Sequence, residues 1–465
     1  MTMKQTMLVI TDSLHKKVKK HLLPGDGLEA AAVIFCHSGT GQKYHRLIAH
    51  EVFLVPYSDS KRKSHVLKWN FAKCFSPDKI TEIDKRGLSI ITIHSHPDGV
   101  SDFSITDDRN DKEIFPSINN WFDDNRPNGS AVMLPDGSIF ARIVDAKGKF
   151  HTMDSVASIG DNIQIWKNLK PSKKTDYGQK IAQVFGGKTL DLLRSMRVGV
   201  VGCSGTGSII TELLARNCVG NLVVVDNDYM EPKNLNRIIN GTITDARKKQ
   251  SKVSVIKNAV KRMGMGTRVE PYQSLSDSPD VVRALVDCDV IFGCVDSHFG
   301  RYHLDCIASA YHIPYFDVGV GLIADGKGGI EAADAVSHYM HPEGQDLFSR
   351  GGYTMEQVTA ENYKRNDPER YKERKIADYL ATVGEEQPAV MSVNMQAACL
   401  AFNDFMARIH PYRIDDNQEF AVQRFRIAHG HYMQNAADKQ QSKLFEKWAG
   451  TGDNSILVKN NISHD

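Results

Sequence analysis

Residues 196–228 read MRVGVVGCSGTGSIITELLARNCVGNLVVVDND, and this stretch decides the fold of the second half of the chain. A valine-rich run leads into a glycine turn, a helical apolar pattern follows, and a second valine-rich run ends in acidic residues. This order predicts a βαβ unit. Because glycines let the backbone approach phosphates at a helix N-terminus, we expect Gly202, Gly205 and Gly207 to line phosphates. Asp226 ends the second strand, where ribose is commonly bound, which fits NAD and ATP equally well.

The sequence after this unit distinguishes between the two nucleotides. Lysine, asparagine and arginine gather in KNLNR at residues 233–237, QSK follows at 250–252, and VIFGCVDSHFGRYHLDCIASAYHIPYFDVGVGL spans 290–322. A hydride-transfer enzyme has no need for these side chains. A nucleotidyl-transfer enzyme needs cations to neutralise a triphosphate and an acid to hold magnesium. The pattern therefore favours ATP.

In order, these elements resemble the ubiquitin-activating, ThiF and MoeB adenylyltransferase family, whose pattern is a glycine turn, DxD, SNLxRQ, GxxK and CxD. The resemblance covers about residues 177–410 and implies ATP- and Mg²⁺-dependent conversion of a carboxylate to an acyl-adenylate. It assigns ribose to Asp226, phosphates to Arg237 and Lys252, and magnesium to Asp296. The nucleotide-binding residues that it implies are Gly202, Gly205, Gly207, Asp226, Asp228, Asn234, Arg237 and Lys252.

Two departures from the family pattern matter. No cysteine lies between Cys306 and Cys399, and Cys399 sits in the apolar pattern ACLAF, which favours a buried structural role over a reactive one. An internal thioester step is therefore in doubt. Relatives also carry an arginine before the first strand, where this chain has DYGQK. Lys180 would have to substitute without the planar fork of arginine, so slow adenylation or a different dimer arrangement would follow.

The first half carries a second constellation, SIITIHSHPDGVSDFSITDDRND, at residues 89–111. The β-branched run from Leu88 to Ile93 predicts a strand, and two histidines follow at its exit. Histidines two apart on an extended chain point to one side, so His94 and His96 can converge on one ion. Asp107 could supply a third ligand, and catalytic zinc commonly keeps three protein ligands. By itself, HxH also fits an ordinary solvated turn.

The longer pattern resembles the HxHPx(6)SxxD signature of the JAB (JAMM, MPN-plus) metalloprotease family over about residues 5–150. Glu29 ahead of AAAVIFC matches the upstream glutamate of that family. The resemblance implies that Glu29 is the general base and that Ser104 stabilises the oxyanion. Glu51, ahead of VFLVP, is the rival for the base. The zinc ligands that the resemblance implies are His94, His96 and Asp107.

Composition sets wider limits. A length of 465 residues indicates about two to three domains. The formal charge of +2 gives no hint of a nucleic-acid partner, and no apolar stretch approaches the roughly 20 residues that span a membrane. The N-terminus lacks a signal-peptide pattern, so the cytoplasm is expected. Eight scattered cysteines without a CxxC pair indicate neither a disulfide framework nor a cysteine-rich zinc site.

We therefore expect an α/β protein with an N-terminal JAB-type α/β/α metalloprotease domain and a C-terminal Rossmann-like ThiF adenylation domain. The predicted boundaries are 1–165 for the peptidase, 166–176 for a linker, 177–430 for the adenylyltransferase and 431–465 for a C-terminal tail. The tail and the residues before it predict a strand in FAVQRFRIAHGHYM and a short helix in KQQSKLFEKWAG. His341, His429 and His431 are expected to be plain polar residues.

The function that both resemblances imply is bifunctional. The first domain would cleave a ubiquitin-like precursor or conjugate after its C-terminal glycine, and the second would adenylate that glycine. The acyl group would then pass to a conjugating-enzyme-like partner or a sulfur donor, and the adenylation domain would form a homodimer. Two alternatives stay open: adenylation of a small carboxylate or a tRNA base, and a nucleotide-binding scaffold with a degenerate second domain.

Overall fold

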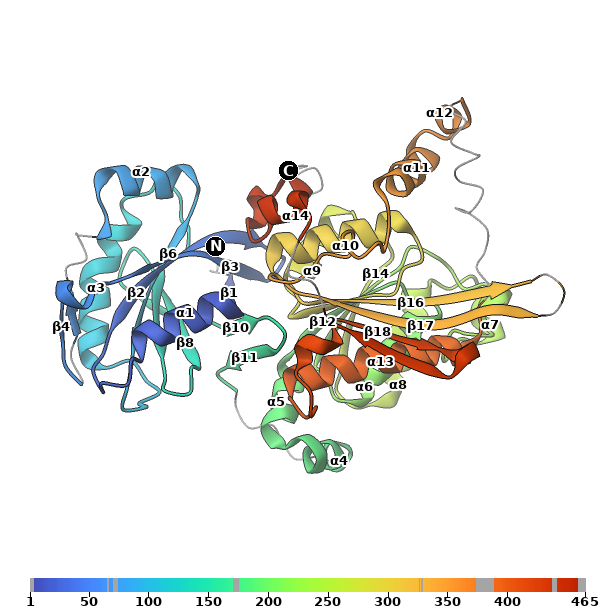
Figure 1. Cartoon of the computed structure of the whole chain (residues 1–465), viewed down its shortest axis with the longest axis horizontal. Coiled ribbons are helices and arrows are strands. Elements are labelled where there is room, and N and C mark those ends of the chain that lie inside the picture. The colour runs from blue at the N-terminus through green and yellow to red at the C-terminus, as the bar shows by residue number, and fades with distance from the viewer. Residues whose placement is uncertain are drawn as a thin grey trace. The chain divides into compact units, whose positions relative to one another are not determined.

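Figure 1 draws the chain in a computed structural model that describes residues 4–64, 67–69, 74–169, 175–325, 327, 329–373, 389–436 and 441–458. The chain divides into two compact units. The first contains Met1–Asn168, Ala310–His312 and Ala449–Lys459. The second contains Leu169–Ser309, Ile313–Trp448 and Asn460–Asp465. Each unit is built around its own sheet.

The first unit has a nine-stranded mixed sheet. In spatial order its strands are β11 (Ile163–Lys167), β10 (Ser155–Ile159), β1 (Gln5–Thr11), β3 (Tyr44–Leu54), β2 (Ala31–Thr40), β6 (Ser89–Ser95), β7 (Gly129–Met133), β8 (Ile139–Val144) and β9 (Phe150–Thr152). β1 runs parallel to β10 and β3, and β6 runs parallel to β7. β2, the central strand, is antiparallel to both of its neighbours, β3 and β6. A short hairpin joins β4 (Ser60–Arg62) to β5 (Leu67–Trp69).

Helices cover both faces of this sheet (Figure 1). Successive residues of a strand face opposite sides, and in β2 Ile34 joins one hydrophobic core while Phe35 joins another. The first core includes Val18 of α1 (Asp12–Leu22). The second includes Ile83 of α2 (Pro77–Lys85) and Phe115 of α3 (Ile105–Asn119). The unit is therefore the α/β/α layered structure that the sequence predicted.

A segment from the far end of the sequence completes the first unit. The amide of Thr40, at the end of β2, donates to Asp453 Oδ2 over 2.9 Å. Gly452 leaves room for the carbonyl of Ser38, with which a Cβ would collide. Val458 is buried. The end of β2 is thus held by residues more than 400 positions away in the sequence.

The second unit has an eight-stranded sheet. In spatial order its strands are β14 (Arg268–Tyr272), β13 (Asn221–Val225), β12 (Arg197–Val201), β15 (Val290–Gly293), β16 (Tyr315–Ala324), β17 (Ile330–Met340), β18 (Val422–Arg426) and β19 (His431–Asn435). Neighbours from β14 to β16 are parallel, and neighbours from β16 to β19 are antiparallel. The sheet is therefore mixed, with a parallel Rossmann-like half.

Helices connect the parallel strands, as right-handed crossovers require. α6 (Gly205–Arg216) links β12 to β13, which confirms the βαβ unit predicted from residues 196–228. α13 (Met391–Ile409) packs on β16 and β17. The other helices are α4 (Asp176–Phe185), α5 (Gly187–Ser195), α7 (Ile243–Arg247), α8 (Lys252–Met263), α9 (Pro279–Val286), α10 (His298–Tyr311), α11 (Met355–Asn366), α12 (Pro368–Glu373) and α14 (Lys443–Trp448). Among the described helices, none is long and apolar enough to cross a membrane.

The alternating stretch at residues 420–433 forms two strands where one was predicted. β18 ends at Arg426, and β19 begins at His431 after a turn in which Gly430 has a φ of +63°. A positive φ is readily adopted by glycine, so the glycine turns the chain back and makes a hairpin. The predicted short helix is present as α14, although residues 439–440 of its predicted stretch lie outside the described residues.

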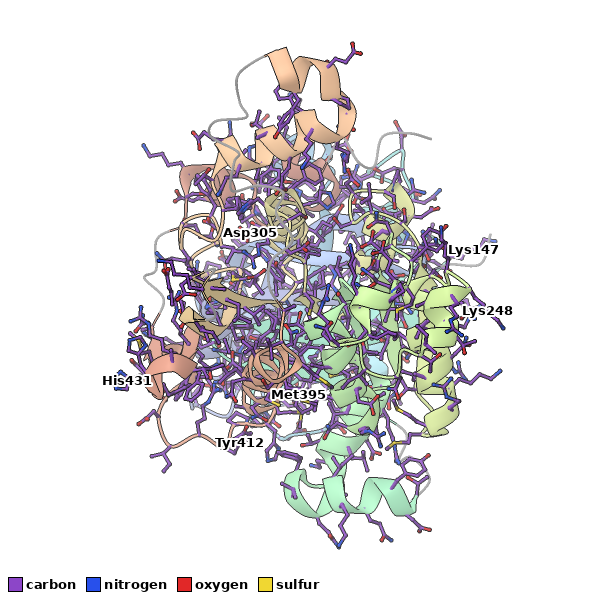
Figure 2. All side chains as sticks on the ribbon, turned by 90° about the vertical axis from the view of Figure 1, so that its right-hand side faces the viewer. Lys147, Lys248, Asp305, Met395, Tyr412 and His431 are labelled. Carbon is purple, nitrogen blue, oxygen red and sulfur yellow. The ribbon has the colours of Figure 1, made fainter. Side chains whose placement is uncertain are left out.

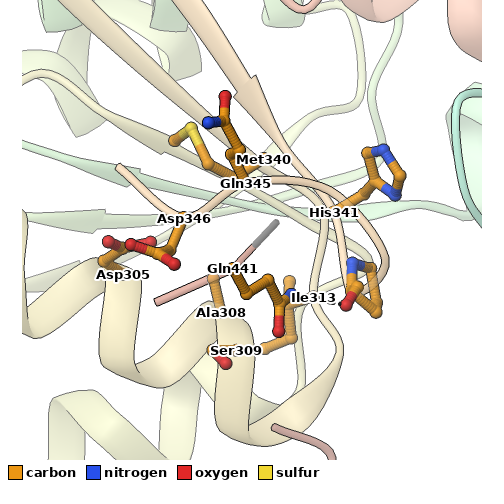
Figure 3. Close-up of a pocket in the computed structure, with 10 residues that line it drawn as sticks. Asp305, Ala308, Ser309, Ile313, Met340, His341, Gln345, Asp346 and Gln441 are labelled. Atoms are coloured by element: carbon orange, nitrogen blue, oxygen red, sulfur yellow. Dashed lines mark hydrogen bonds between the residues drawn. The ribbon is translucent and has the colours of Figure 1, made fainter. Parts of the chain in front are cut away.

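A small pocket lies in the second unit (Figure 3). Asp305 of α10 and Asp346 line it together with Gln441. Both aspartates are buried, and Asp305 Oδ2 accepts hydrogen bonds from Tyr353 Oη over 2.9 Å and from two backbone amides. Burial and the neighbouring charge of Asp346 raise the pKa of Asp305 to about 7. Between about pH 4 and pH 7, Asp305 is therefore protonated in the folded protein and ionised in the unfolded chain.

We expect Asp453→Ala to weaken the first unit. The substitution removes a charge-assisted acceptor for the Thr40 amide, which costs about 1–3 kcal/mol of the free energy of unfolding. Thermal unfolding of the full chain, monitored through tryptophan fluorescence, measures the loss. Asp415→Ala, at an exposed aspartate, is the control and should leave the midpoint unchanged. Equal midpoints for the two variants would contradict the structural role of this segment.

We expect Asp305 to make folding less favourable as the pH rises. Its pKa is about 7 when folded and about 4 when unfolded, so its contribution falls between these values by roughly 4 kcal/mol. The free energy of unfolding is measured with urea at pH 5 and at pH 8. The buried histidines act equally in both proteins, so Asp305→Asn should lose less of this free energy between the two pH values than the wild type loses. If the free energy of unfolding changes equally in the two proteins between pH 5 and pH 8, the pKa of Asp305 is not raised by folding.

Candidate metal and nucleotide sites

The two predicted histidine ligands meet at the exit of β6. His94 is the last but one residue of that strand and pairs with Ala31 and Val132 on the neighbouring strands. The backbone amide of His96 donates to Met133 O over 3.0 Å, which continues the strand direction for one more residue. The two Nε2 atoms lie 3.2 Å apart. The strand thus presents both imidazoles to one point.

Asp107 reaches the same point from the first turn of α3. Its carboxylate oxygens lie 3.3 Å from His94 Nε2 and 3.5 Å from His96 Nε2. A tetrahedral zinc site with ligand bonds of about 2.0–2.1 Å has edges of about 3.3 Å between ligand atoms. The separation of the two histidine Nε2 atoms is close to that value, and each carboxylate oxygen of Asp107 lies at a similar distance from one of the histidines. Among the described residues, this is the one group of three or more histidine, cysteine or acidic side chains close enough to hold an ion.

Hydrogen bonds fix both kinds of ligand. Ser104 Oγ accepts from the amide of Asp107 over 3.1 Å, and Asp107 Oδ2 accepts from the amide of Ser104 over 2.7 Å, which is a capping box. His96 Nδ1 lies 2.8 Å from the carbonyl of Val100. Because a carbonyl can only accept, Nδ1 carries the proton and Nε2 keeps its lone pair for a metal. Ser104 itself is exposed.

Glu29 precedes Ala30, whose backbone is hydrogen-bonded to Ser95, the residue between the two histidines. The Ser95 amide donates to the Ala30 carbonyl, and the Ala30 amide donates to Ser95 Oγ, each over 3.1 Å. Burial raises the pKa of Glu29, and the charges of His94 and His96 oppose that rise. In the described part of the chain, the Glu29 carboxylate forms no ion pair or hydrogen bond. Glu29 is therefore free to accept a proton at the site.

Glu51, the rival for the base, has a different environment. Its carboxylate lies 2.8 Å from Arg86 and 3.5 Å from Lys79. Although burial alone would raise the pKa of Glu51, the hydrogen bond from Arg86 and the two positive charges lower it. A carboxylate held by two cations is a poor base, so the geometry favours Glu29 over Glu51.

The glycine turn of the second unit brings three chain segments together. A Cβ at Gly202 would collide with the carbonyl of Cys294 beyond the end of β15, and Gly202 itself has a φ of +91°. A Cβ at Gly207 would collide with the carbonyl of Gly202. Ser204, at the start of α6, makes no side-chain cap, so the first amides of this helix keep their hydrogens for a ligand.

Asp226 closes the turn from the end of β13. Its carboxylate accepts from the amide of Cys203 over 2.7 Å and from the amide of Asp228 over 2.8 Å. Burial raises the pKa of Asp226, and Lys252, whose Nζ is 3.8 Å away, lowers it. Lys252 Nζ also lies 2.7 Å from Asp228 Oδ2. The structure thus brings together Asp226, Asp228 and Lys252 at the glycine turn.

The remaining predicted nucleotide residues lie on neighbouring loops. Asn234 is buried, and its Oδ1 accepts from the amide of Glu231 over 3.0 Å, which shapes the turn at residues 232–234. Arg237 is half-buried and donates to Lys233 O over 3.0 Å. Asp296 is exposed beyond β15, the neighbour of β12. Because carboxyl ends of parallel strands meet at one sheet edge, Asp296 and the glycine turn share that edge.

Arg301 of α10 is a candidate that the motifs did not identify. The charge of Asp317 raises the pKa of Arg301, and Asp296 adds to the effect. Arg301 Nε lies 3.4 Å from the buried Asp317 Oδ1. In the sequence, Arg301 is the arginine of FGR and follows Asp296 by five residues. Its position near the sheet edge depends on the direction of α10, which only the fold shows.

The expectation that Cys399 is buried is wrong. Cys399 is exposed on α13, on the same side as Met395, which is 39% exposed and is labelled in Figure 2. One apolar side of α13 packs on the sheet and leaves the other side open, so an apolar pattern did not mean burial at this position. Partial burial nevertheless raises the pKa of the Cys399 thiol, the reverse of what a reactive thiolate needs.

Comparison with known proteins assigns both halves of the chain. Residues 177–435 match the model of the ThiF family, and residues 11–143 match that of the prokaryotic homologs of the JAB domain. The "Adenylyltransferase and sulfurtransferase UBA4" of Meyerozyma guilliermondii is 26% identical over 36% of this chain and 39% of its own length. The "SAMP-activating enzyme E1" of Haloferax volcanii is 31% identical over 26% of this chain and 44% of its own length.

The chain thus spans less than half the length of these curated relatives. The crystal structure of E. coli MccB with ATP is 16% identical over 58% of this chain and 73% of that chain, with a TM-score of 0.44. The ThiF match covers more than half of the 465 residues. The chain therefore belongs to the ThiF family and carries an N-terminal JAB-type domain, the fusion that the two sets of motifs indicated.

Proposed function

We propose that this protein is a bifunctional enzyme of a ubiquitin-like pathway, in which the first unit is a zinc peptidase and the second adenylates the exposed C-terminal glycine. The convergence of His94, His96 and Asp107 supports the peptidase most directly, because two imidazoles and a carboxylate this close together are the kinds of ligand that zinc takes. The ThiF family match and the relative named as an activating enzyme support the adenylation. One substrate would serve both units.

The peptidase chemistry follows from the residues around the site. Zinc, when bound, would supply a Lewis acid for the attacking water and the scissile carbonyl. Glu29, with its raised pKa, would take the proton of the water and pass it to the leaving amine. The Ser104 hydroxyl, which is exposed at the start of α3, would donate to the developing oxyanion.

The second unit would bind ATP at the edge where the glycine turn lies. The uncapped start of α6 and the ammonium of Lys252 would hold the phosphates, and Asp226 would hold the ribose. We propose Asp296 as the carboxylate that holds magnesium, which would neutralise phosphate charge. A carboxylate oxygen of the glycine would then attack the α-phosphorus, so that an acyl-adenylate forms and pyrophosphate leaves.

The acyl group would leave for a nucleophile outside this chain. Six of the eight cysteines are buried, and burial raises the pKa of the exposed Cys399. A partner cysteine of the conjugating-enzyme kind, or a sulfur donor, would therefore accept the acyl group. We further propose a homodimer through the second unit, as the family resemblance implies. Lys180, the proposed substitute for the missing arginine, is exposed on α4.

We expect Glu29→Gln to reduce cleavage of a ubiquitin-like fusion at least about 100-fold, because the general base is lost, while zinc content stays stoichiometric. His94→Ala should lose the zinc itself. Cleavage assays together with elemental analysis of the purified proteins measure both effects. Glu51→Gln is the matched control and should keep both zinc and activity. Loss of cleavage in Glu51→Gln, with activity retained in Glu29→Gln, would reverse the assignment of the base.

We expect Lys252→Ala to reduce ATP–pyrophosphate exchange about 100-fold or more, because a buried cation that meets the phosphates is lost. Exchange is measured with magnesium and a ubiquitin-like protein that ends in glycine. Arg216→Ala, which removes a cation at the far end of α6, should have no effect. No exchange in a wild-type sample that binds zinc and cleaves the fusion would favour a nucleotide-binding scaffold in the second unit.

A further inference from the structure

One guanidinium lies behind the candidate metal centre, buried between α3 and the sheet. Arg142 belongs to β8, and its side chain is 6% exposed. It faces the first two turns of α3, the helix that carries Asp107. We infer that Arg142 is a positioning residue that sets the place of Asp107 and Ser104 at the metal centre. This inference rests on the zinc site proposed above.

The first set of contacts joins Arg142 to α3 beyond the ligand. Arg142 Nη2 donates to Asp111 Oδ2 over 2.6 Å, and Nε donates to the same oxygen over 3.0 Å. Nη1 donates to Asp108 Oδ1, so one side chain holds the residue after Asp107 and the residue one turn later. Ser130 Oγ of β7 also donates to Asp111 Oδ2. The start of α3 is thereby tied to two strands.

The second set of contacts reaches the chain ahead of the ligand. The guanidinium carbon of Arg142 lies 3.7 Å from the ring centroid of Phe103 and 3.8 Å from that of Phe150. Phe103 directly precedes Ser104, the cap of α3. Arg142 therefore contacts the chain on both sides of the Ser104–Asp107 capping box.

Only arginine can make both sets of contacts at once. Its planar fork forms parallel hydrogen bonds in one plane, and both faces of that plane can stack on aromatic rings. A lysine ammonium keeps the charge, but it lacks the fork and the flat faces. If the role of Arg142 is to position the ligand carboxylate, the loss of the fork should disturb metal binding even where the protein remains folded.

The test compares zinc affinity and the visible absorption of the cobalt-substituted protein in the wild type and in Arg142→Lys. Cobalt absorption in a site of this kind depends on ligand geometry. Outer contacts of metal ligands typically change affinity by about 10–100-fold, so we expect a loss in that range together with an altered cobalt spectrum. Asp108→Asn changes one exposed link of the network and should give a smaller shift of the same kind.

Arg126→Lys is the matched control. Arg126 also pairs with two aspartates and also lies over a ring, that of Phe122, in the same unit. It has no contact with α3's first turn in the described structure, so its variant should keep the affinity and the spectrum of the wild type.

The possible results distinguish the positioning role of Arg142 from the zinc site on which it rests. A wild-type protein that binds no zinc overturns the proposed metal centre and this assignment with it. A wild-type protein that binds zinc, with Arg142→Lys indistinguishable from it, overturns the assignment alone. If Arg142→Lys does not fold, Asp108→Asn decides: a shifted cobalt spectrum supports the role, and an unchanged one rejects it.

Discussion

The backbone amides at the start of a helix have no partner within the helix, and both candidate sites depend on how this chain satisfies them. In α3, the Ser104 hydroxyl and the Asp107 carboxylate satisfy them from within, so the carboxylate that caps the helix is also fixed in place beside His94 and His96. In α6, Ser204 provides no side-chain cap, and the amides stay available for an anion. The same local constraint thus fixes a carboxylate beside two histidines in one unit and leaves backbone amides open in the other.

Buried carboxylates in this protein behave according to their neighbours. Burial raises the pKa of Asp111, and the hydrogen bonds from Ser130 and Arg142 to its Oδ2 oppose that rise. Among the described residues, no lysine or arginine pairs with the carboxylate of Glu29, and burial raises its pKa, which suits a group that must take up a proton. Asp305 lies close to a second aspartate, and its pKa rises to about 7. All three carboxylates are buried, so the groups next to each one decide how far its pKa rises.

The motifs predicted much of each site because their residues are close in sequence. His94 and His96 are two apart, and Ser104 and Asp107 form a capping box three apart, so local geometry alone brings each pair together. The glycine turn and Asp226 belong to one βαβ unit, whose topology is nearly obligatory. The α/β class and the two-family fusion could therefore be predicted without a structure.

What the sequence by itself determined is the set of local elements: a strand that ends in two histidines, a capped helix, and a glycine turn between two valine strands. Only the tertiary structure shows that Glu29 and Glu51 have different environments, since Arg86 and Lys79 meet Glu51 from elsewhere in the chain. Only the tertiary structure brought Arg142 to α3 and Asp453 to Thr40. Such contacts join residues far apart in sequence, and no local periodicity or spacing records them, because they depend on how whole strands and helices pack.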